Sequence, residues 1–72
     1  MIKLYQIKSG RLIAGLEINE NGICVNCAPI LRKWCYNKHI NDIIKKCKKL
    51  GNELYFIKEY STPFIGLGEF FV

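Results

Sequence analysis

The chain has 72 residues, half of them hydrophobic, and its eleven Lys and Arg residues against six Asp and Glu give a formal net charge of +5. A chain of this length forms a single domain with one small core, which excludes a multidomain enzyme. No apolar run approaches the ~18 residues of a membrane span and no signal peptide is recognisable, so we expect a cytoplasmic protein without a membrane partner.

The first two predicted elements form a β-hairpin. Ile2 to Lys8 and Leu12 to Ile18 are apolar-rich with partial alternation, and Ser9-Gly10 between them suits a tight turn. The even-numbered residues from 12 to 18 are all apolar, so they form the predicted core face of the second strand.

A third strand and the start of a helix follow. The turn signal at residues 19–22 ends in Gly22, and Ile23, Val25 and Cys27 then alternate toward the core. Because Pro29 is tolerated at the first position of a helix, we expect a helix to begin there.

The helical region has two apolar stripes at helical spacing. The first contains Ile30, Leu31, Trp34 and Cys35, and the second contains Ile40, Ile43, Ile44, Cys47 and Leu50. At ~100° per residue the stripes point in roughly opposite directions, so one straight helix cannot bury both. We therefore expect a turn near Asn37, an end of the second helix at Gly51 and a fourth strand from Leu54 to Tyr60.

The predicted fold is α+β: a small antiparallel sheet made of the hairpin, the third strand and the fourth strand, with the bent helix pair packed on one face. Residues 1–60 form this domain. The apolar tail, residues 61–72, is expected to pack on the sheet or on a second subunit, which favours a homo-oligomer.

Several of these segments together resemble short, uncharacterised proteins encoded by bacteriophages and prophages. They are AGLE at positions 14–17, the turn ending in Gly22, APILRKW at positions 28–34 and a basic helix that ends at Gly51. The resemblance implies no enzyme activity and no named site. It implies an accessory protein that binds and modulates a host protein or ribonucleoprotein complex, for example as an anti-CRISPR-like inhibitor of a defence complex.

The basic residues are concentrated in the middle of the chain, where Asp42 is the only acidic residue between positions 29 and 51. This asymmetry favours an anionic partner, and the alternative function is a small nucleic-acid-binding module. The plain reading is a solvated helix face. The candidate contact residues are Arg32, Lys33, Tyr36, Lys38, Lys45, Lys46, Lys48 and Lys49.

The four cysteines are expected to be reduced in the cytosol. Cys24 and Cys27 form a Cys-X-X-Cys pair, and Cys35 precedes His39 by one helical turn, which is a spacing that zinc sites use. Buried thiols are the competing interpretation, because free cysteine is among the most buried residue types. We predict no cofactor, with zinc on Cys24, Cys27, Cys35 and His39 as the alternative.

Catalytic signatures are lacking in the sequence. It contains no phosphate-cradling glycine-rich loop and no nucleophile elbow, and no paired carboxylates occupy a plausible cleft. We therefore expect a binding protein and not an enzyme.

Overall fold

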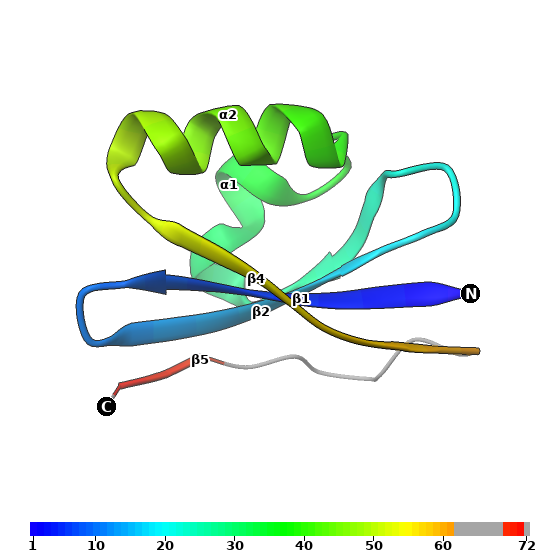
Figure 1. The fold of residues 1–72 in the computed structure, drawn as a ribbon, viewed down its shortest axis with the longest axis horizontal. Helices are drawn as coiled ribbons and strands as arrows, with labels where there is room; N and C mark the ends of the chain where they lie inside the picture. The colour runs from blue at the N-terminus through cyan, green and yellow to red at the C-terminus, as the bar shows by residue number, and fades with distance from the viewer. Residues whose placement is uncertain (62–68, 72) are drawn as a thin grey trace.

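This computed structural model describes residues 1–61 and the backbone of residues 69–71. The strands are β1 (Ile2–Ser9), β2 (Leu12–Ile18), β3 (Cys24–Cys27), β4 (Glu53–Tyr60) and β5 (Glu69–Phe71), and the helices are the 3-10 turn η1 (Pro29–Leu31), α1 (Arg32–Cys35) and α2 (Ile40–Leu50). The sheet has the order β3-β2-β1-β4, with β5 also paired to β2. The helices lie on one face of the sheet (Figure 1). The predicted α+β fold is confirmed.

The N-terminal hairpin is the centre of the sheet. β1 pairs antiparallel with β2 from Lys3 opposite Ile18 to Ser9 opposite Leu12, and β4 pairs with the other edge of β1. Gly10 in the connecting turn has a φ of 61°, a left-handed conformation that glycine adopts without steric cost. The predicted hairpin is therefore confirmed.

The core lies between the sheet and the helices. Its buried side chains are Ile7, Ala14, Leu16, Ile18, Cys24, Cys27, Ala28, Leu31, Cys35, Ile43 and Cys47, with Tyr5, Trp34, Ile40 and Leu54 packed against them. The even-numbered face of β2 is thus the core face, as its alternation predicted. Two members of the predicted helical stripes depart from this pattern, because Ile30 and Leu50 are about half exposed.

The alternation predicted for the third strand was wrong. Val25 is exposed, whereas Cys24 on the preceding position is buried. The cause is an irregularity in the pairing of β3 with β2: Ile18 lies opposite Cys24, but Glu17 lies opposite Asn26. An extra residue in one strand resets the inward and outward alternation, so Cys24 and Cys27 both face the core.

The two α-helices are separated where the sequence predicted a turn. Asn37 has a φ of 64°, and α2 ends at Gly51 with a φ of 73°. The segment between the helices also hydrogen-bonds with β3: the Cys24 N–H donates to the Lys38 carbonyl over 2.9 Å, and the Asn37 N–H donates to the Cys24 carbonyl over 2.8 Å. The bent helix pair is therefore fixed to the sheet by backbone hydrogen bonds as well as by packing.

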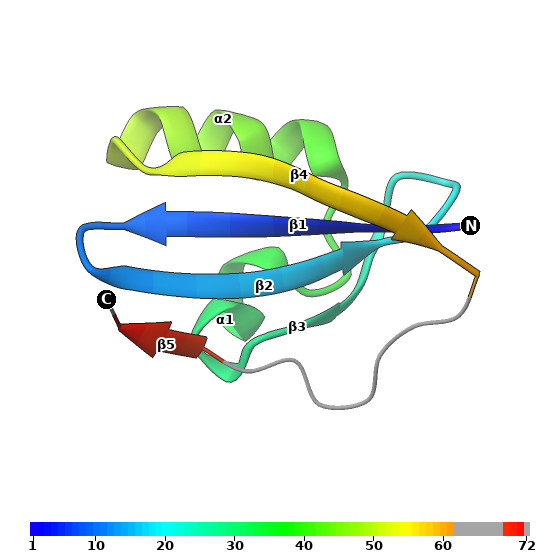
Figure 2. The ribbon, with the colours of Figure 1, turned by 60° about the horizontal axis from the view of Figure 1, so that its bottom comes forward.

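The backbone of β5 pairs with β2 from Leu12 opposite Phe71 to Ala14 opposite Glu69. β5 and β3 both lie beside β2 on the side away from β1 (Figure 2). The sequence predicted that the tail, residues 61–72, packs on the sheet or on a second subunit. That prediction concerns residues 62–68 and 72 and the side chains of residues 69–71, which lie outside the described residues. In the part of the chain that is described, no helix is long and apolar enough to cross a membrane.

The turn before β3 and the start of α2 are joined through Gly22 and His39. The Ile40 N–H donates to the Gly22 carbonyl over 2.7 Å, and a Cβ added to Gly22 would lie 2.6 Å from His39 Nε2. His39 in turn caps α2, because its Nδ1 accepts a hydrogen bond from the Asn41 N–H. Position 22 therefore requires glycine for two reasons. Its φ of 83° is a left-handed conformation that other residues rarely adopt, and the imidazole of His39 leaves no room for a Cβ.

We predict that Gly22→Ala lowers the free energy of unfolding by about 2–3 kcal/mol, which combines backbone strain with displacement of the helix cap. Gly10→Ala is the matched control, since Gly10 also has a positive φ but a Cβ there would meet no heavy atom within 4 Å. It should cost only about 1 kcal/mol. Urea unfolding of both variants measures the difference, and equal losses would contradict a role for the His39 contact.

Candidate functional site

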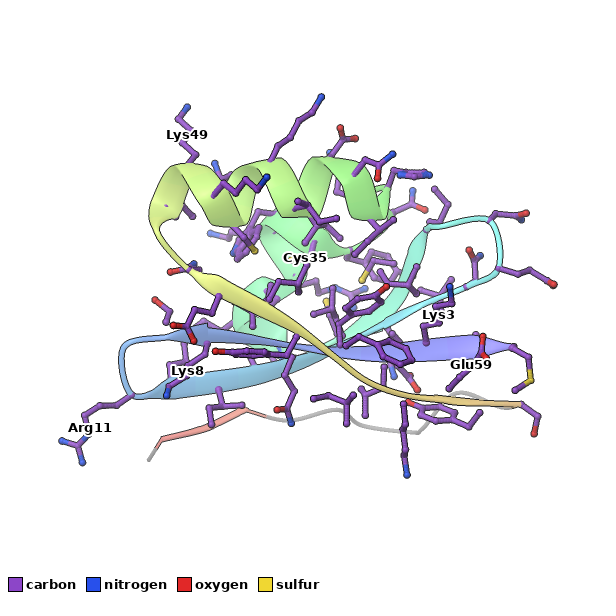
Figure 3. All side chains as sticks on the ribbon, viewed as in Figure 1. Lys3, Lys8, Arg11, Cys35, Lys49 and Glu59 are labelled. Atoms are coloured by element: carbon purple, nitrogen blue, oxygen red, sulfur yellow. The ribbon has the colours of Figure 1, made fainter. Side chains whose placement is uncertain are left out.

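Helix α2 is strongly amphipathic. Ile43 and Cys47 are buried against the sheet. At ~100° per residue, Lys45 and Lys49 lie on the opposite side of the helix, with Lys46 and Lys48 flanking them. All four lysines are exposed. Lys49 extends away from the sheet, whereas Cys35 lies between the helices and the sheet (Figure 3).

The remaining candidate residues lie on α1 and in the turn that follows it. Arg32, Lys33, Tyr36 and Lys38 are all exposed. The Arg32 guanidinium lies over the Tyr36 ring, 4.3 Å from its centroid, which is a favourable cation–π geometry. Trp34 from the same helix is half-buried against the core. The structure thus places every predicted contact residue in solvent.

Charge is segregated between the two layers of the molecule. We call residues 29–51, which contain η1, α1 and α2, the helical layer. It holds seven Lys and Arg against one acidic residue, Asp42, whereas the rest of the chain holds four basic and five acidic residues. The helical layer therefore carries +6 and the remainder −1, so the whole net positive charge of the chain comes from one layer.

Helix electrostatics account for only part of this charge. Lys48 and Lys49 lie in the last turn of α2, where cations interact favourably with the helix dipole. Lys45 and Lys46 lie before that turn, and Arg32 and Lys33 belong to a helix of only four residues. Stabilisation of the end of α2 by cations thus accounts for Lys48 and Lys49 but not for the other basic residues of the helical layer.

The structure does not assemble the zinc alternative, Cys24, Cys27, Cys35 and His39. Within the described residues, no three His, Cys, Asp or Glu side chains form a group that could hold a metal ion. His39 serves instead as the cap of α2, over a distance of 3.1 Å from Asn41 N to His39 Nδ1. The turn at Asn37 ends the first helix before His39, so the helical spacing from Cys35 to His39 is lost.

The four thiols are reduced and buried in the core. The Cys24 thiol donates a hydrogen bond to the Asn26 carbonyl over 3.4 Å, and burial raises the pKa of Cys24 from 9.0 to about 12. Burial likewise raises the pKa values of Cys27, Cys35 and Cys47. These thiols are protonated at neutral pH and therefore lack the thiolate that nucleophilic attack requires. The cysteines therefore act as core residues.

Sequence reasoning missed a buried carboxylate. Glu17 lies on the face of the sheet away from the helices and is 0% exposed. Its Oε1 accepts a hydrogen bond from Asn26 Nδ2 over 2.9 Å, and its Oε2 accepts one from the Tyr60 hydroxyl. Burial and this hydrogen bond raise the pKa of Tyr60. No local signal predicts this cluster, since its members come from β2, β3 and β4.

Comparison of the chain with family models, with curated proteins and with solved structures finds no match.

We predict that the free energy of unfolding falls as the pH rises above 9.0, the ordinary pKa of a thiol, and keeps falling until about 12. Below pH 9 the thiols are protonated in both the folded and the unfolded chain, whereas above pH 9 they ionise only in the unfolded chain. Each such thiol then lowers the free energy of unfolding by ~1.4 kcal/mol per pH unit. Urea unfolding between pH about 8 and about 10.5 measures the slope.

The Cys24→Ala variant should show a shallower dependence of the free energy of unfolding on pH than the unmodified chain, whatever its stability at neutral pH. Tyr60→Phe is the control for a part-buried tyrosine hydroxyl, because the pKa of Tyr60 is also raised above its ordinary value of 10.0. An unchanged slope in Cys24→Ala would contradict the assignment of the pH dependence to the buried thiols.

Proposed function

We propose that the chain is a non-catalytic module that binds nucleic acid through the phosphate backbone, using its helical layer. The observation that carries the proposal is the charge segregation: the helical layer holds seven basic residues against Asp42 alone. A polyanion with closely spaced charges is the partner class that such a surface attracts most strongly, because each neutralised phosphate releases counterions.

The arrangement of α2 suits contact with several phosphates at once. Lys45 and Lys49 are separated by one helical turn, which is ~6 Å along the axis, and Lys46 and Lys48 lie to either side of them. Duplex DNA carries one negative charge per ~1.7 Å of helix axis. A row of lysines of this kind meets more than one phosphate in any register along the nucleic acid, so binding does not require a unique position.

The side chains of the helical layer favour backbone contact over base reading. A lysine ammonium is a flexible point charge, whereas base edges are read mainly by bidentate Arg, Asn and Gln side chains. Helix α2 contains four lysines and one asparagine, Asn41. We therefore expect binding with little sequence preference.

Two features support a role without catalysis. The nucleophile candidates are thiols that burial keeps protonated. The histidine caps α2 through its Nδ1, and its ring lies against Gly22. General acid–base or nucleophilic chemistry needs such groups to meet a substrate, and here both kinds are used in the packing of the fold.

We predict that the triple variant Lys45→Gln, Lys46→Gln, Lys49→Gln loses most of its affinity for duplex DNA and RNA. The logarithm of its affinity should fall less steeply with the logarithm of salt concentration, by about 2 to 3 in slope, because about three counterions fewer are released. Fluorescence anisotropy with labelled oligonucleotides over a salt series measures both quantities.

The matched control is Lys3→Gln, Lys8→Gln, Arg11→Gln, which removes the same amount of charge from the strands and the hairpin turn (Figure 3). It should bind with a nearly unchanged salt slope. Equal losses in the two variants would show that net charge alone governs binding, and normal binding by the α2 variant would remove the proposal.

A second candidate function follows from apolar residues in the same layer. Ile30 and Leu50 are 48% and 53% exposed, and with Trp34 they line a pocket of about 190 Å³. A phosphate backbone has no apolar group to fill such a pocket. A protein partner can place an apolar side chain in the pocket and acidic side chains against the basic residues around it. This surface supports the accessory role in which a phage protein binds host machinery.

Affinity purification of the tagged protein from host lysate, in parallel with and without nuclease, separates the two candidates. A stoichiometric protein that survives nuclease, and that is lost with Leu50→Glu, supports the accessory role. Nucleic acid that is lost on nuclease treatment, with no protein retained, supports the first candidate and contradicts the second.

A further inference from the structure

Strand β4 has one edge that no described residue occupies. β1 pairs with the other edge of β4. One edge of β2 pairs with β1, and the opposite edge pairs with β3 and β5. On the outer edge of β3, which has only four residues, the N–H and the carbonyl of Cys24 are hydrogen-bonded to Lys38 and Asn37. The long free edge among the described residues is therefore that of β4, and a free edge is a template for pairing with another strand.

The residues along this edge are unusually apolar for a solvent-facing strand. Tyr55, Phe56 and Ile57 are 46%, 55% and 44% exposed. Phe56 also borders a groove of about 470 Å³ between α2 and β4, to which Tyr5 and Ile44 contribute. Native sheets protect such edges with charges or cover them, so an apolar edge beside an apolar groove indicates an interface.

The side-chain directions along β4 are set by its pairing with β1. Leu54 and Phe56 lie opposite Ile7 and Tyr5, on the helix side of the sheet. The register shift after Phe56 makes Ile57 an extra residue, so Lys58 returns to the same face as Tyr55 and Glu53, away from the helices. Glu53 accepts a hydrogen bond from the Tyr55 hydroxyl, and Lys58 Nζ lies 5.7 Å from the centroid of the Tyr60 ring.

We propose that β4 pairs antiparallel with β4 of a second copy of this chain, with Tyr55 on the two-fold axis. In this register Leu54 of each copy faces Phe56 of the other on the helix side. Glu53 of each copy faces Lys58 of the other on the opposite side, which gives two complementary charge pairs. The bulge is needed for this match, because without it Glu53 and Lys58 would point to opposite faces.

The dimer places both α2 helices on the same side of one continuous sheet, since the two-fold axis is perpendicular to that sheet. The lysine faces of the two copies then lie side by side. Their repulsion weakens the dimer at low ionic strength, and a bound polyanion relieves it. Dimer formation itself does not depend on nucleic acid, so it is measured on protein freed of nucleic acid by nuclease and high salt.

The test is a charge exchange across the proposed pair. We expect sedimentation equilibrium of the full chain to show a species of twice 8.4 kDa. Glu53→Lys alone and Lys58→Glu alone should each raise the dissociation constant by about tenfold, because both symmetric pairs become like-charged. The double variant Glu53→Lys, Lys58→Glu should return it to within about twofold of the original.

Glu20→Lys is the matched control, because it makes the same charge change at an exposed position in the turn before β3. It should leave the dissociation constant unchanged. A monomer at every concentration tested, or a double variant that does not regain affinity although its circular dichroism is native, would overturn the proposal.

A cross-link tests the axis independently. The Tyr55→Cys variant should form a disulfide-linked dimer under mild oxidation at low protein concentration, because the two introduced thiols lie side by side on the axis. The four native thiols are buried and should not compete. Glu20→Cys should not. Equal cross-linking of the two variants would mean that the dimer does not have Tyr55 on its axis.

Discussion

The burial of β2 on both faces and both edges is the constraint on which the rest of the fold depends. Residues 14–18 are all buried, although they include Glu17. A buried carboxylate is tolerated only with hydrogen-bond donors, and Asn26 and Tyr60 supply them from β3 and β4. The polar cluster thus holds the two outer strands to the central one, on the face that the helices do not cover.

The helix face of the sheet is stabilised by different means. Four thiols and a few aliphatic side chains fill the small core, and their burial keeps the thiols neutral. Because the core takes only one side of α2, its lysines are all free to face solvent. The same packing that buries the cysteines leaves the lysines of α2 on one outer surface, which is the basis of the proposed function.

Two irregularities decide which residues share a face. The extra residue in β3 directs both Cys24 and Cys27 into the core, and the extra residue in β4 puts Glu53 and Lys58 on one side of the sheet. A regular strand would separate both pairs, since its side chains alternate. The content of the core and the charge pattern of the free edge both follow from these bulges.

The sequence by itself determined the hairpin, the turn at Asn37, the helix end at Gly51 and the exposure of the lysines, because glycine and helical spacing act over a few residues. Tertiary structure alone decided that Val25 faces solvent, that Glu17 is buried and that the His39 ring lies against Gly22. Those outcomes depend on pairing between strands that are distant in sequence, and local patterns carry no information about that pairing.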